Sequence, residues 1–234
     1  IIFSFLMWII IASSTIYFCS LIFFLFGLKK TKVSNKNKIN DIDVSIILCV
    51  RNGEESLPNI LNDFSNQKYN GNLEFIIVDD ESSDKTKEII SEFVEKDSRF
   101  KYIHSNTGSI NLNHKKKALD AGIKKSNYDW LLFTDVDCRV NENWVSGMSN
   151  NYLNNDYVVG FSMTNPGNSI VSKFQSIDFN MLMFSACAAT TAGYPLASSG
   201  QNQSYKKSVF KQVDGFNKIE NLLQGDDSIF LQIC

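Results

Sequence analysis

Asp135 and Asp137 form an Asp-Val-Asp pair that comes just after the apolar residues 130–133. Carboxylate oxygens are the ligands that Mg²⁺ and Mn²⁺ prefer, and Mg²⁺ is usually held by one or two carboxylates together with substrate phosphates. A cation held by this pair would bridge a diphosphate and neutralise a leaving group. The alternative is that both aspartates belong to a turn or a helix cap, where aspartates are common.

Polar residues follow two other apolar runs in the same way. Arg51 and Asn52 come directly after residues 44–50, and Asp80 comes just after residues 75–78. Continuous apolar runs with β-branched residues are typical of parallel strands that are buried on both faces. Sheets of this kind bind ligands beyond the carboxyl ends of their strands, where the strand order reverses. We therefore expect these residues and the Asp-Val-Asp pair to meet in one crevice.

Apolar periodicity predicts the elements that would position these residues. Between the apolar runs, apolar residues recur every three or four positions, which indicates helices. The predicted strands are 44–50, 75–78, 100–103 and 130–133, and the predicted helices are 57–64, 82–94 (with Ser82, Ser83 and Asp84 as N-caps) and 115–125. The alternation predicts an α/β fold with a mostly parallel sheet that is flanked by helices and joined by right-handed crossovers.

The pattern is weaker after Val140. We expect a strand over 157–163, a helix over 170–184, a loop over 193–203 and a final helix that opens at 225–227. The helix over 170–184 carries its apolar residues on one side. Two interpretations of that helix stay open: it packs in the core, or it lies on a membrane interface beside the site.

Residues 1–28 contain no Asp, Glu, Lys, Arg or His. As a helix this segment would be roughly 42 Å long, whereas the hydrocarbon core of a bilayer is about 30 Å thick. We predict a retained transmembrane helix, with a signal peptide and a buried core helix as the alternatives. Residues 23–26 (Phe-Phe-Leu-Phe) stand where a signal peptide needs small residues for cleavage.

Residues 29–43 are predicted to form a basic linker, with lysines at positions 29, 30, 32, 36 and 38. Positive charge beside a membrane helix marks its cytoplasmic side, so we expect the catalytic domain to be cytoplasmic. A solvated linker without topological meaning is the alternative. The five cysteines form no CxxC motif, which agrees with a reducing compartment.

Composition and absent motifs exclude several classes. A net charge of −2 argues against a nucleic-acid partner, and 44% hydrophobic with 21% charged residues argues against disorder. Neither GxGxxG nor GxxxxGK[ST] occurs, so a dinucleotide-binding Rossmann site and a P-loop are not expected. His104 and His114 are too few and too far apart for a zinc site.

Six sequence blocks together resemble the family 2 glycosyltransferases, which have the GT-A fold. In chain order they are VSIILCVRNGEESL, FIIVDDESSDKT, HKKKALDAGI, LLFTDVDC, GQNQSYKKSVF and GFNKIENLLQGDDS. The resemblance implies a nucleotide-diphosphate sugar donor of the UDP type, Mg²⁺ or Mn²⁺, and inversion at the anomeric carbon. It also implies a membrane-anchored catalytic domain over 44–234. That domain would have a Rossmann-like nucleotide-sugar-binding half at 44–140 and an acceptor half, truncated at the C-terminus, at 141–234.

The resemblance assigns donor-side roles to five residues. Arg51 and Asn52 match the turn that approaches the nucleotide, and Glu54 matches the acidic residue just after it. Asp80 matches the aspartate that contacts the base or ribose. Lys115 matches the lysine that is expected near the diphosphate.

Four aspartates complete the implied site. Asp135 and Asp137 match the DxD pair, with Asp137 as the better metal ligand and Asp135 also beside the nucleotide sugar. Asp227 matches the second acid of the family's Glu-Asp motif, which deprotonates the acceptor hydroxyl. Asp226 stands where the family has Glu, so it is assigned only to the acceptor side. Either aspartate could instead cap the helix that follows.

The predicted function is therefore inverting transfer of a sugar to an acceptor hydroxyl at the cytoplasmic membrane face, with a polysaccharide or a lipid-linked acceptor. A nucleotidyltransferase is one alternative, but its usual Gly-rich loop is replaced here by residues 51–55 (Arg-Asn-Gly-Glu-Glu). A non-catalytic sugar-nucleotide-binding protein is the other, and it would not need Asp227.

Overall fold

The structure is a computed structural model that describes residues 2–30 and 41–234. Most of the predicted basic linker, including the lysines at positions 32, 36 and 38, lies outside the described residues. The chain divides into two compact units. We call helix α1 (Ile2–Lys30) with Phe161–Ala197 the helical unit, and residues 41–160 with Ser198–Cys234 the sheet unit. The predicted division at residue 140 stays a prediction.

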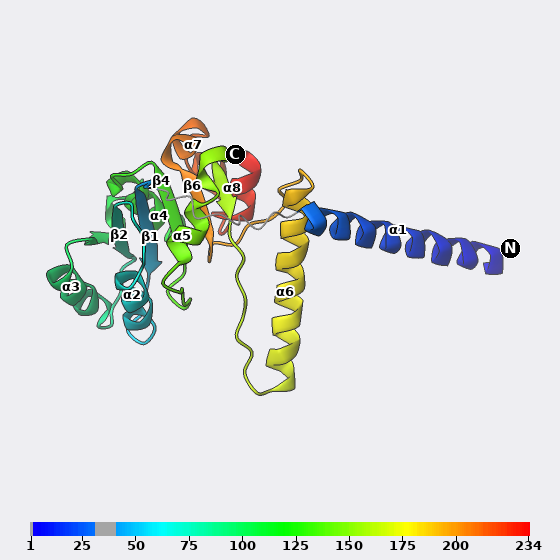
Figure 1. The fold of residues 1–234 in the computed structure, drawn as a ribbon, viewed down its shortest axis with the longest axis horizontal. Helices are drawn as coiled ribbons and strands as arrows, with labels where there is room; N and C mark the ends of the chain where they lie inside the picture. Colours follow the sequence, from blue (N-terminus) through cyan, green and yellow to red (C-terminus); the bar gives the residue numbers. More distant parts are fainter. Residues whose placement is uncertain (1, 31–40) are drawn as a thin grey trace. The chain divides into compact units, whose positions relative to one another are not determined.

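The described elements alternate between strands and helices through the first part of the sheet unit (Figure 1). They are β1 (Val44–Val50), α2 (Leu57–Ser65), β2 (Leu73–Asp79), α3 (Thr86–Lys96), β3 (Phe100–His104), η1 (Ser105–Thr107), α4 (His114–Lys125), β4 (Trp130–Thr134), α5 (Trp144–Ser149), η2 (Tyr152–Asn154), β5 (Tyr157–Val159), α6 (Ile170–Thr191), β6 (Gln203–Lys206), α7 (Lys207–Gln212), η3 (Asn217–Ile219) and α8 (Ser228–Ile233).

The six strands form one sheet in the order β3-β2-β1-β4-β6-β5. The first four strands in this order run parallel, and β6 pairs antiparallel with both β4 and β5. The chain moves outward from β1 to β2 and β3 and then returns to place β4 on the other side of β1. The strand order therefore reverses between β1 and β4, which is where sheets of this type bind ligands. The predicted mostly parallel α/β sheet is confirmed.

Helices cover both faces of the sheet. Ile46 and Leu48 of β1 pack with α2, α3 and α5, whereas Ile47, whose side chain points to the opposite face, packs with α4, α7 and α8. The predicted apolar face of α2 is buried at all four positions: Leu57, Ile60, Leu61 and Phe64. Burying one such side chain contributes about 1.5–3 kcal/mol to folding.

Gly122 lets α4 approach the sheet closely. A Cβ at this position would lie 2.7 Å from Cγ2 of Ile47 and 3.0 Å from Cγ2 of Val78. Because real Cβ atoms are not found at such distances from their neighbours, a larger residue would push α4 outward. This close contact fixes α4 over β1 and β2 and so determines where its first turn lies.

Three local predictions are corrected by the structure. The strand expected over 157–163 ends at Val159, and Gln203, expected in a loop, begins strand β6. Helix α3 has Lys85 at its N-cap position rather than Ser82, Ser83 or Asp84, although the Asp84 carboxylate accepts a bond from the backbone N–H of Thr86, the first helical residue, at 3.0 Å. The physical reason is that this loop is hydrogen-bonded to the turn after β1, as described below, and the helix starts only after those bonds.

The helical unit contains α1 and α6. Among the described residues, α1 is the one helix long and apolar enough to cross a bilayer, with a mean hydropathy of 2.3 in its most apolar window. Its C-terminal part packs on the C-terminal part of α6: a Cβ on Gly27 would lie only 2.1 Å from the carbonyl oxygen of Ala188. The rings of Phe23 and Tyr194 also approach each other, with centroids 6.0 Å apart.

The apolar side of α6 is exposed, which corrects the interpretation of this segment as a core helix. The large apolar side chains of the helix that are exposed are Ile170, Val171, Phe174, Ile177, Met181, Leu182 and Phe184. The residues that the helix buries are mostly small: Ser176, Ala188 and Ala189, together with Met183. Periodicity correctly indicated a helix there, but it does not determine what covers the apolar side.

Candidate active site

The turn after β1 is hydrogen-bonded to the loop after β2. The backbone N–H of Asn52 donates to Oγ of Ser82 at 2.9 Å, and the backbone N–H of Ser83 donates to Oδ1 of Asn52 at 2.8 Å. Glu54 accepts a bond from the backbone N–H of Lys85 at 3.2 Å. Asn52 has a φ of 52°, a left-handed conformation that asparagine tolerates better than most residues. The side chains of Asn52 and Glu54 therefore hold the turn after β1 and the loop after β2 in register.

Asp80 and Arg51 stand at the ends of two neighbouring strands. The backbone N–H of Asp80 donates to the carbonyl of Val50 at 2.8 Å, while Arg51 is exposed. The preceding Asp79 is buried and accepts a bond from the Tyr102 hydroxyl at 3.1 Å. Burial and this aspartate raise the pKa of Tyr102 to about 12. Of the two consecutive aspartates, Asp79 is thus used inside the fold, whereas Asp80 is only partly buried.

Lys115 joins two segments that are far apart in the sequence. Its Nζ lies 2.7 Å from Oδ1 of Asp135, just after β4, and 3.5 Å from Oδ2 of Asp226, just before α8. Burial acts to lower the pKa of Lys115, but the two carboxylates outweigh it and hold that pKa above its usual value. Lys115 is therefore a charged ammonium group with an acidic residue on each side.

Several charged residues near the end of β1 affect the pKa of the Cys49 thiol. Burial raises the pKa of this thiol; Lys115 acts to lower it, and Asp80, Asp226 and Asp135 act to raise it further. Four of the predicted site residues, Asp80, Lys115, Asp135 and Asp226, thus lie close enough to act on one partly buried side chain of β1. The structure brings these four together, and their roles toward a ligand stay predictions.

Asp135 and Asp137 lie in a tight turn after β4. The backbone N–H of Cys138 donates to the carbonyl of Asp135 at 3.1 Å, and the Asp137 residue is exposed. Within residues 2–30 and 41–234, no three His, Cys, Asp or Glu side chains form a ready metal cage. Mg²⁺ does not need such a cage, because it commonly takes one or two carboxylates and completes its coordination with phosphates and water. The two carboxylates therefore fit a metal that arrives with a diphosphate.

The two acidic residues before α8 have different surroundings. Asp226 pairs with Lys115, and its backbone carbonyl accepts a bond from Nε2 of Gln203 at 3.2 Å. Asp227 is the N-cap residue of α8 and accepts a bond at Oδ1 from the backbone N–H of Ser228 at 2.5 Å. The ion pair of Lys115 is with Asp226 and not with Asp227. Of the two aspartates, Asp227 remains free of a cation among the described residues.

Two residues beside this cluster were not predicted. A Cβ at Gly200 would lie 3.2 Å from Nζ of Lys115 and 3.7 Å from Oδ2 of Asp226. Lys116 is buried, and its Nζ donates to the carbonyl of Ile219 at 2.5 Å. Gly200 opens one of the blocks that carry the family resemblance, so a signal was present. Lys116 stands in a run of three lysines, and nothing local distinguishes it from its neighbours.

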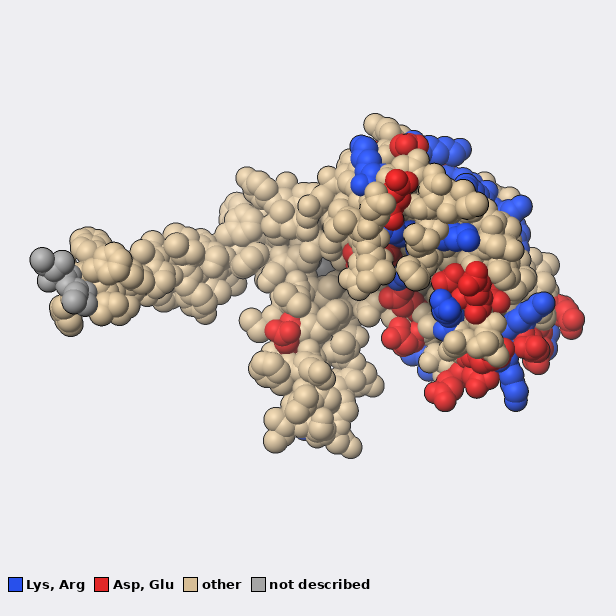
Figure 2. Space-filling view, turned by 180° about the vertical axis from the view of Figure 1, so that it is seen from behind, with Lys and Arg blue, Asp and Glu red and all other residues tan. Residues whose placement is uncertain are grey.

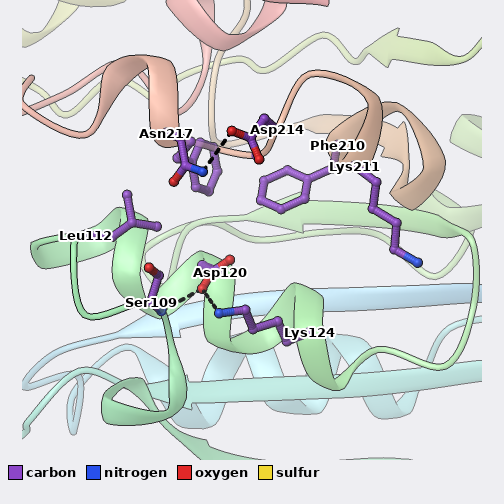
Figure 3. Close-up of a pocket in the computed structure, with 10 residues that line it drawn as sticks. Ser109, Leu112, Asp120, Lys124, Phe210, Lys211, Asp214 and Asn217 are labelled. Atoms are coloured by element: carbon purple, nitrogen blue, oxygen red, sulfur yellow. Dashed lines mark hydrogen bonds and ion pairs between the residues drawn. The ribbon is translucent and has the colours of Figure 1, made fainter.

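A pocket of about 300 Å³ lies elsewhere on the sheet unit, between α4 and the segment from α7 to η3 (Figure 3). Its acidic residues already have partners: Asp120 accepts a bond from the backbone N–H of Ser109 at 2.7 Å and pairs with Lys124, and Asp214 accepts one from Asn217 at 3.0 Å. None of the predicted site residues lines it.

Residues 45–214 match Glycosyl transferase family 2, and the chain belongs to this family. Poly-β-1,6-N-acetyl-D-glucosamine synthase of Staphylococcus aureus (strain COL) is 29% identical over 223 residues, which cover 90% of this chain and 52% of that protein. The synthase of the same name from Staphylococcus epidermidis is 29% identical over 177 residues, which cover 73% of this chain and 41% of that protein. The chain thus spans about half the length of the curated relatives it matches.

Solved structures share the fold. A mannosyltransferase from Pyrobaculum calidifontis in complex with GDP-Man and Mn²⁺ matches with a TM-score of 0.66 at 15% identity, covering 94% of this chain and 61% of that chain. S. aureus TarS 1–349 in complex with UDP-GlcNAc matches with a TM-score of 0.56 at 19% identity, covering 82% of this chain and 53% of that chain. The sheet unit is therefore of the GT-A type, as the sequence predicted.

Proposed function

We propose that this glycosyltransferase moves a sugar, with inversion, from a UDP-sugar to a hydroxyl group of a growing glycan. The observation that carries the proposal is the position of Lys115 between Asp135 and Asp226, at the reversal point between β1 and β4. A diphosphate needs cationic partners at this position, and the leaving group of the reaction is a nucleoside diphosphate. The names of the S. aureus and S. epidermidis relatives favour N-acetylglucosamine as the first sugar to test.

On the donor side, Asp80 binds the base or ribose, and Arg51 and the turn held by Asn52 and Glu54 close over the nucleotide. Lys115 neutralises the diphosphate. Asp137, together with Asp135, would hold Mg²⁺ or Mn²⁺. When bound, that cation supplies charge stabilisation to the departing diphosphate.

On the acceptor side, Asp227 takes the proton from the acceptor hydroxyl as its oxygen attacks the anomeric carbon. The bond from that carbon to the diphosphate oxygen breaks in the same step, so the anomeric configuration inverts. Asp227 suits this role better than Asp226, because Asp226 is already paired with Lys115. Asp226 instead keeps Lys115 oriented toward the donor.

The location at a membrane is part of this proposal. Helix α1 spans the bilayer, and Lys29 and Lys30 at its end mark the cytoplasmic side. The catalytic unit then meets UDP-sugars in the cytoplasm. An acceptor at the membrane, either a lipid-linked sugar or the end of a polysaccharide, would be within reach.

The test is an assay of the full chain in lipid nanodiscs with UDP-GlcNAc, UDP-glucose and GDP-mannose, each with Mn²⁺ and with EDTA. We expect metal-dependent release of UDP and a product whose new linkage is β, as inversion of an α-linked donor requires. Conversion of UDP-GlcNAc and added pyrophosphate to UTP and sugar 1-phosphate, without transfer to a glycan, would indicate a nucleotidyltransferase. Binding of UDP-GlcNAc without turnover on any glycan acceptor would indicate a sugar-nucleotide-binding protein.

A further inference from the structure

We propose that the exposed apolar stripe of α6 is a second bilayer-contacting surface, which lies along the membrane interface at the end of α1. The inference rests on the proposed function in one respect, namely that α1 spans the membrane. We define the stripe as Ile170, Phe174, Ile177, Met181 and Phe184. These residues recur at intervals of four and three, so they lie on a single line along the helix.

Every side chain of the stripe is at least half exposed, from 50% at Phe184 to 87% at Ile170. An α-helix of 22 residues is about 33 Å long, so the stripe is far larger than a scattered surface hydrophobe. Helices that face water normally place charged residues on the side away from the core. Here the exposed line along α6 is apolar, and Ala188, which packs on α1, continues that line four residues after Phe184.

Charge is almost absent from the helical unit. Between residues 161 and 197 the only charged residues are Lys173 and Asp178. Figure 2 shows the same contrast: charged atoms crowd the surface of the sheet unit and nearly vanish on the helical unit. A surface that is both exposed and uncharged fits lipid better than water.

The geometry inside the helical unit selects the interface rather than a second span. Gly27 of α1 packs on Ala188 of α6, three residues before the helix ends at Lys30. From this junction α6 runs crosswise to α1 (Figure 1). If α1 lies along the bilayer normal, α6 lies along the membrane surface, at the level where lysines meet headgroups. The stripe is therefore continuous with the apolar surface of α1.

A second copy of the chain or the sheet unit could also cover such a stripe, and the experiment separates these occupants. Single cysteines that carry an environment-sensitive fluorophore are placed in a full chain whose native cysteines are replaced. Phe174→Cys and Met181→Cys report on the stripe, and Phe18→Cys reports on α1. Gln175→Cys is the matched control on the same helix, and Glu95→Cys on α3 is the aqueous reference.

In vesicles with acyl-chain-brominated phosphatidylcholine and phosphatidylglycerol, the two stripe labels should be quenched to at least about half the extent of the Phe18→Cys label. The Gln175→Cys and Glu95→Cys labels should be quenched far less. Stripe labels that match the aqueous reference while the α1 label is quenched would overturn the inference alone. Stripe cysteines that cross-link efficiently between two copies of the chain, and whose labels are not quenched, would overturn it as well, because a second copy would then cover the stripe. An unquenched α1 label would remove the span itself, and the inference with it.

A second inference comes from a different observation, the buried ammonium group of Lys116. We infer that Lys116 is a positioning residue for the acceptor-side aspartates. Its Nζ donates to the carbonyls of Ile219 and Leu222, which lie in the segment that leads to Asp226. Lys115 and Lys116 are neighbours on the first turn of α4, and their side chains diverge by about 100° around the helix.

The two lysines thus hold the same segment at two points. Lys115 contacts the Asp226 carboxylate, and Lys116 contacts backbone carbonyls several residues earlier. Burial lowers the pKa of Lys116, which the charge of Asp226 opposes. A buried ammonium group that donates to two carbonyls is costly to remove, because those carbonyls lose their partner. Without the Lys116 ammonium group, the segment that leads to Asp226 and Asp227 loses two hydrogen bonds that hold it against α4.

The test uses Lys116→Met, with Lys116→Arg as the conservative variant and Lys125→Met as the matched control on the exposed end of α4. We expect Lys116→Met to keep UDP affinity within about twofold and to lower kcat for transfer by about tenfold or more, with partial recovery in Lys116→Arg. An equal loss of UDP affinity and of transfer would contradict a role on the acceptor side. A lower Tm with an unchanged kcat per folded molecule would show that the role is structural only. If Lys116→Met does not fold, Lys116→Gln, which keeps a donor, provides the same comparison.

Discussion

The two ends of the parallel strands both carry acidic residues, but only one end neutralises them. At the amino end, the Glu74 carboxylate accepts bonds from Ser45 Oγ at 2.5 Å, from Lys101 Nζ at 2.5 Å and from the backbone N–H of Asn127 at 2.6 Å. At the carboxyl end lie five aspartates, at positions 80, 135, 137, 226 and 227. Among the residues described there, Lys115 is the cation that pairs with them.

This difference in charge neutralisation indicates that the amino end contributes to stability and the carboxyl end to function. A cluster whose hydrogen-bonding capacity is used inside the protein stabilises the fold and has little left for a ligand. A cluster with an excess of one charge destabilises the isolated protein and is relieved when an opposite charge binds. We therefore expect substitutions at the carboxyl end to change chemistry with little loss of stability. Substitutions at the amino end should do the reverse.

The largest expected effect is that of Asp227→Asn. If Asp227 is the general base, turnover should fall by roughly 100- to 10,000-fold, while UDP-sugar affinity and metal dependence stay unchanged. If Asp227 only caps α8, the change costs about 0.5–2 kcal/mol of stability and leaves turnover nearly intact. Steady-state transfer, UDP titration and thermal unfolding together separate the two roles. The control is Asp156→Asn, because Asp156 is an exposed aspartate that pairs with Lys206 away from the site.

The carboxyl end could be predicted because its positions follow from local pattern. Apolar runs such as residues 44–50 fix each strand, and the polar residue that follows a strand must then lie at its carboxyl end. The approach of Asp226 to Lys115 has no such local signal, because it depends on how the long segment after β4 returns to the sheet. That part of the site required the structure.

Strand β6 was missed for a related reason. Gln203 and Ser204 are buried, yet both are polar, so hydropathy gives no sign of a strand. Their side chains are satisfied internally: Ser204 donates to the carbonyl of Leu131 at 2.6 Å, and Gln203 accepts from the Tyr157 hydroxyl at 2.6 Å. Because buried polar residues of this kind give no apolar pattern, a strand that contains them is read as a loop from the sequence.

A smaller effect is expected for Asp137→Asn, which removes one charge from the DxD pair at nearly constant shape. UDP affinity in the presence of Mn²⁺ should fall by about 10- to 100-fold and should approach the value measured in EDTA. The free energy of unfolding without ligand should be unchanged or slightly higher, because one of five clustered negative charges is lost. Calorimetry that gives the same Mn²⁺-dependent UDP affinity in both proteins would show that Asp137 does not hold the metal.

At the amino end, Glu74→Gln should lower the free energy of unfolding by about 1–3 kcal/mol, because the buried partners of the carboxylate lose their charged acceptor. UDP affinity and the turnover of folded protein should remain within about twofold of wild type. Urea unfolding followed by tryptophan fluorescence measures the first quantity. Glu88→Gln, on the exposed side of α3, is the matched control and should leave both quantities unchanged. A Glu74→Gln protein that is as stable as wild type but binds UDP poorly would reverse the comparison between the two ends.

The smallest expected effect is on the pH dependence of stability. Comparing wild type with Glu74→Gln gives the part of that dependence that comes from the Glu74 carboxyl group. Burial acts to raise the pKa of this carboxyl, but the hydrogen bonds from Lys101 and Ser45 outweigh it, and the pKa lies below its ordinary value. A carboxyl whose pKa is lower in the folded state stabilises the protein at pH values above its unfolded pKa, which is about 4.3 for Glu. That contribution is lost as the pH falls through the lower, folded pKa.

Asp63 and Asp97, whose pKa values are also lowered by arginine partners, lose their contributions over the same acid range in wild type and variant alike. The wild-type free energy of unfolding should therefore decrease more steeply than that of Glu74→Gln as the pH falls from about 5 to 3, and the two curves should converge at the acid end. Parallel curves over that range would show that the Glu74 network does not stabilise the fold through its charge.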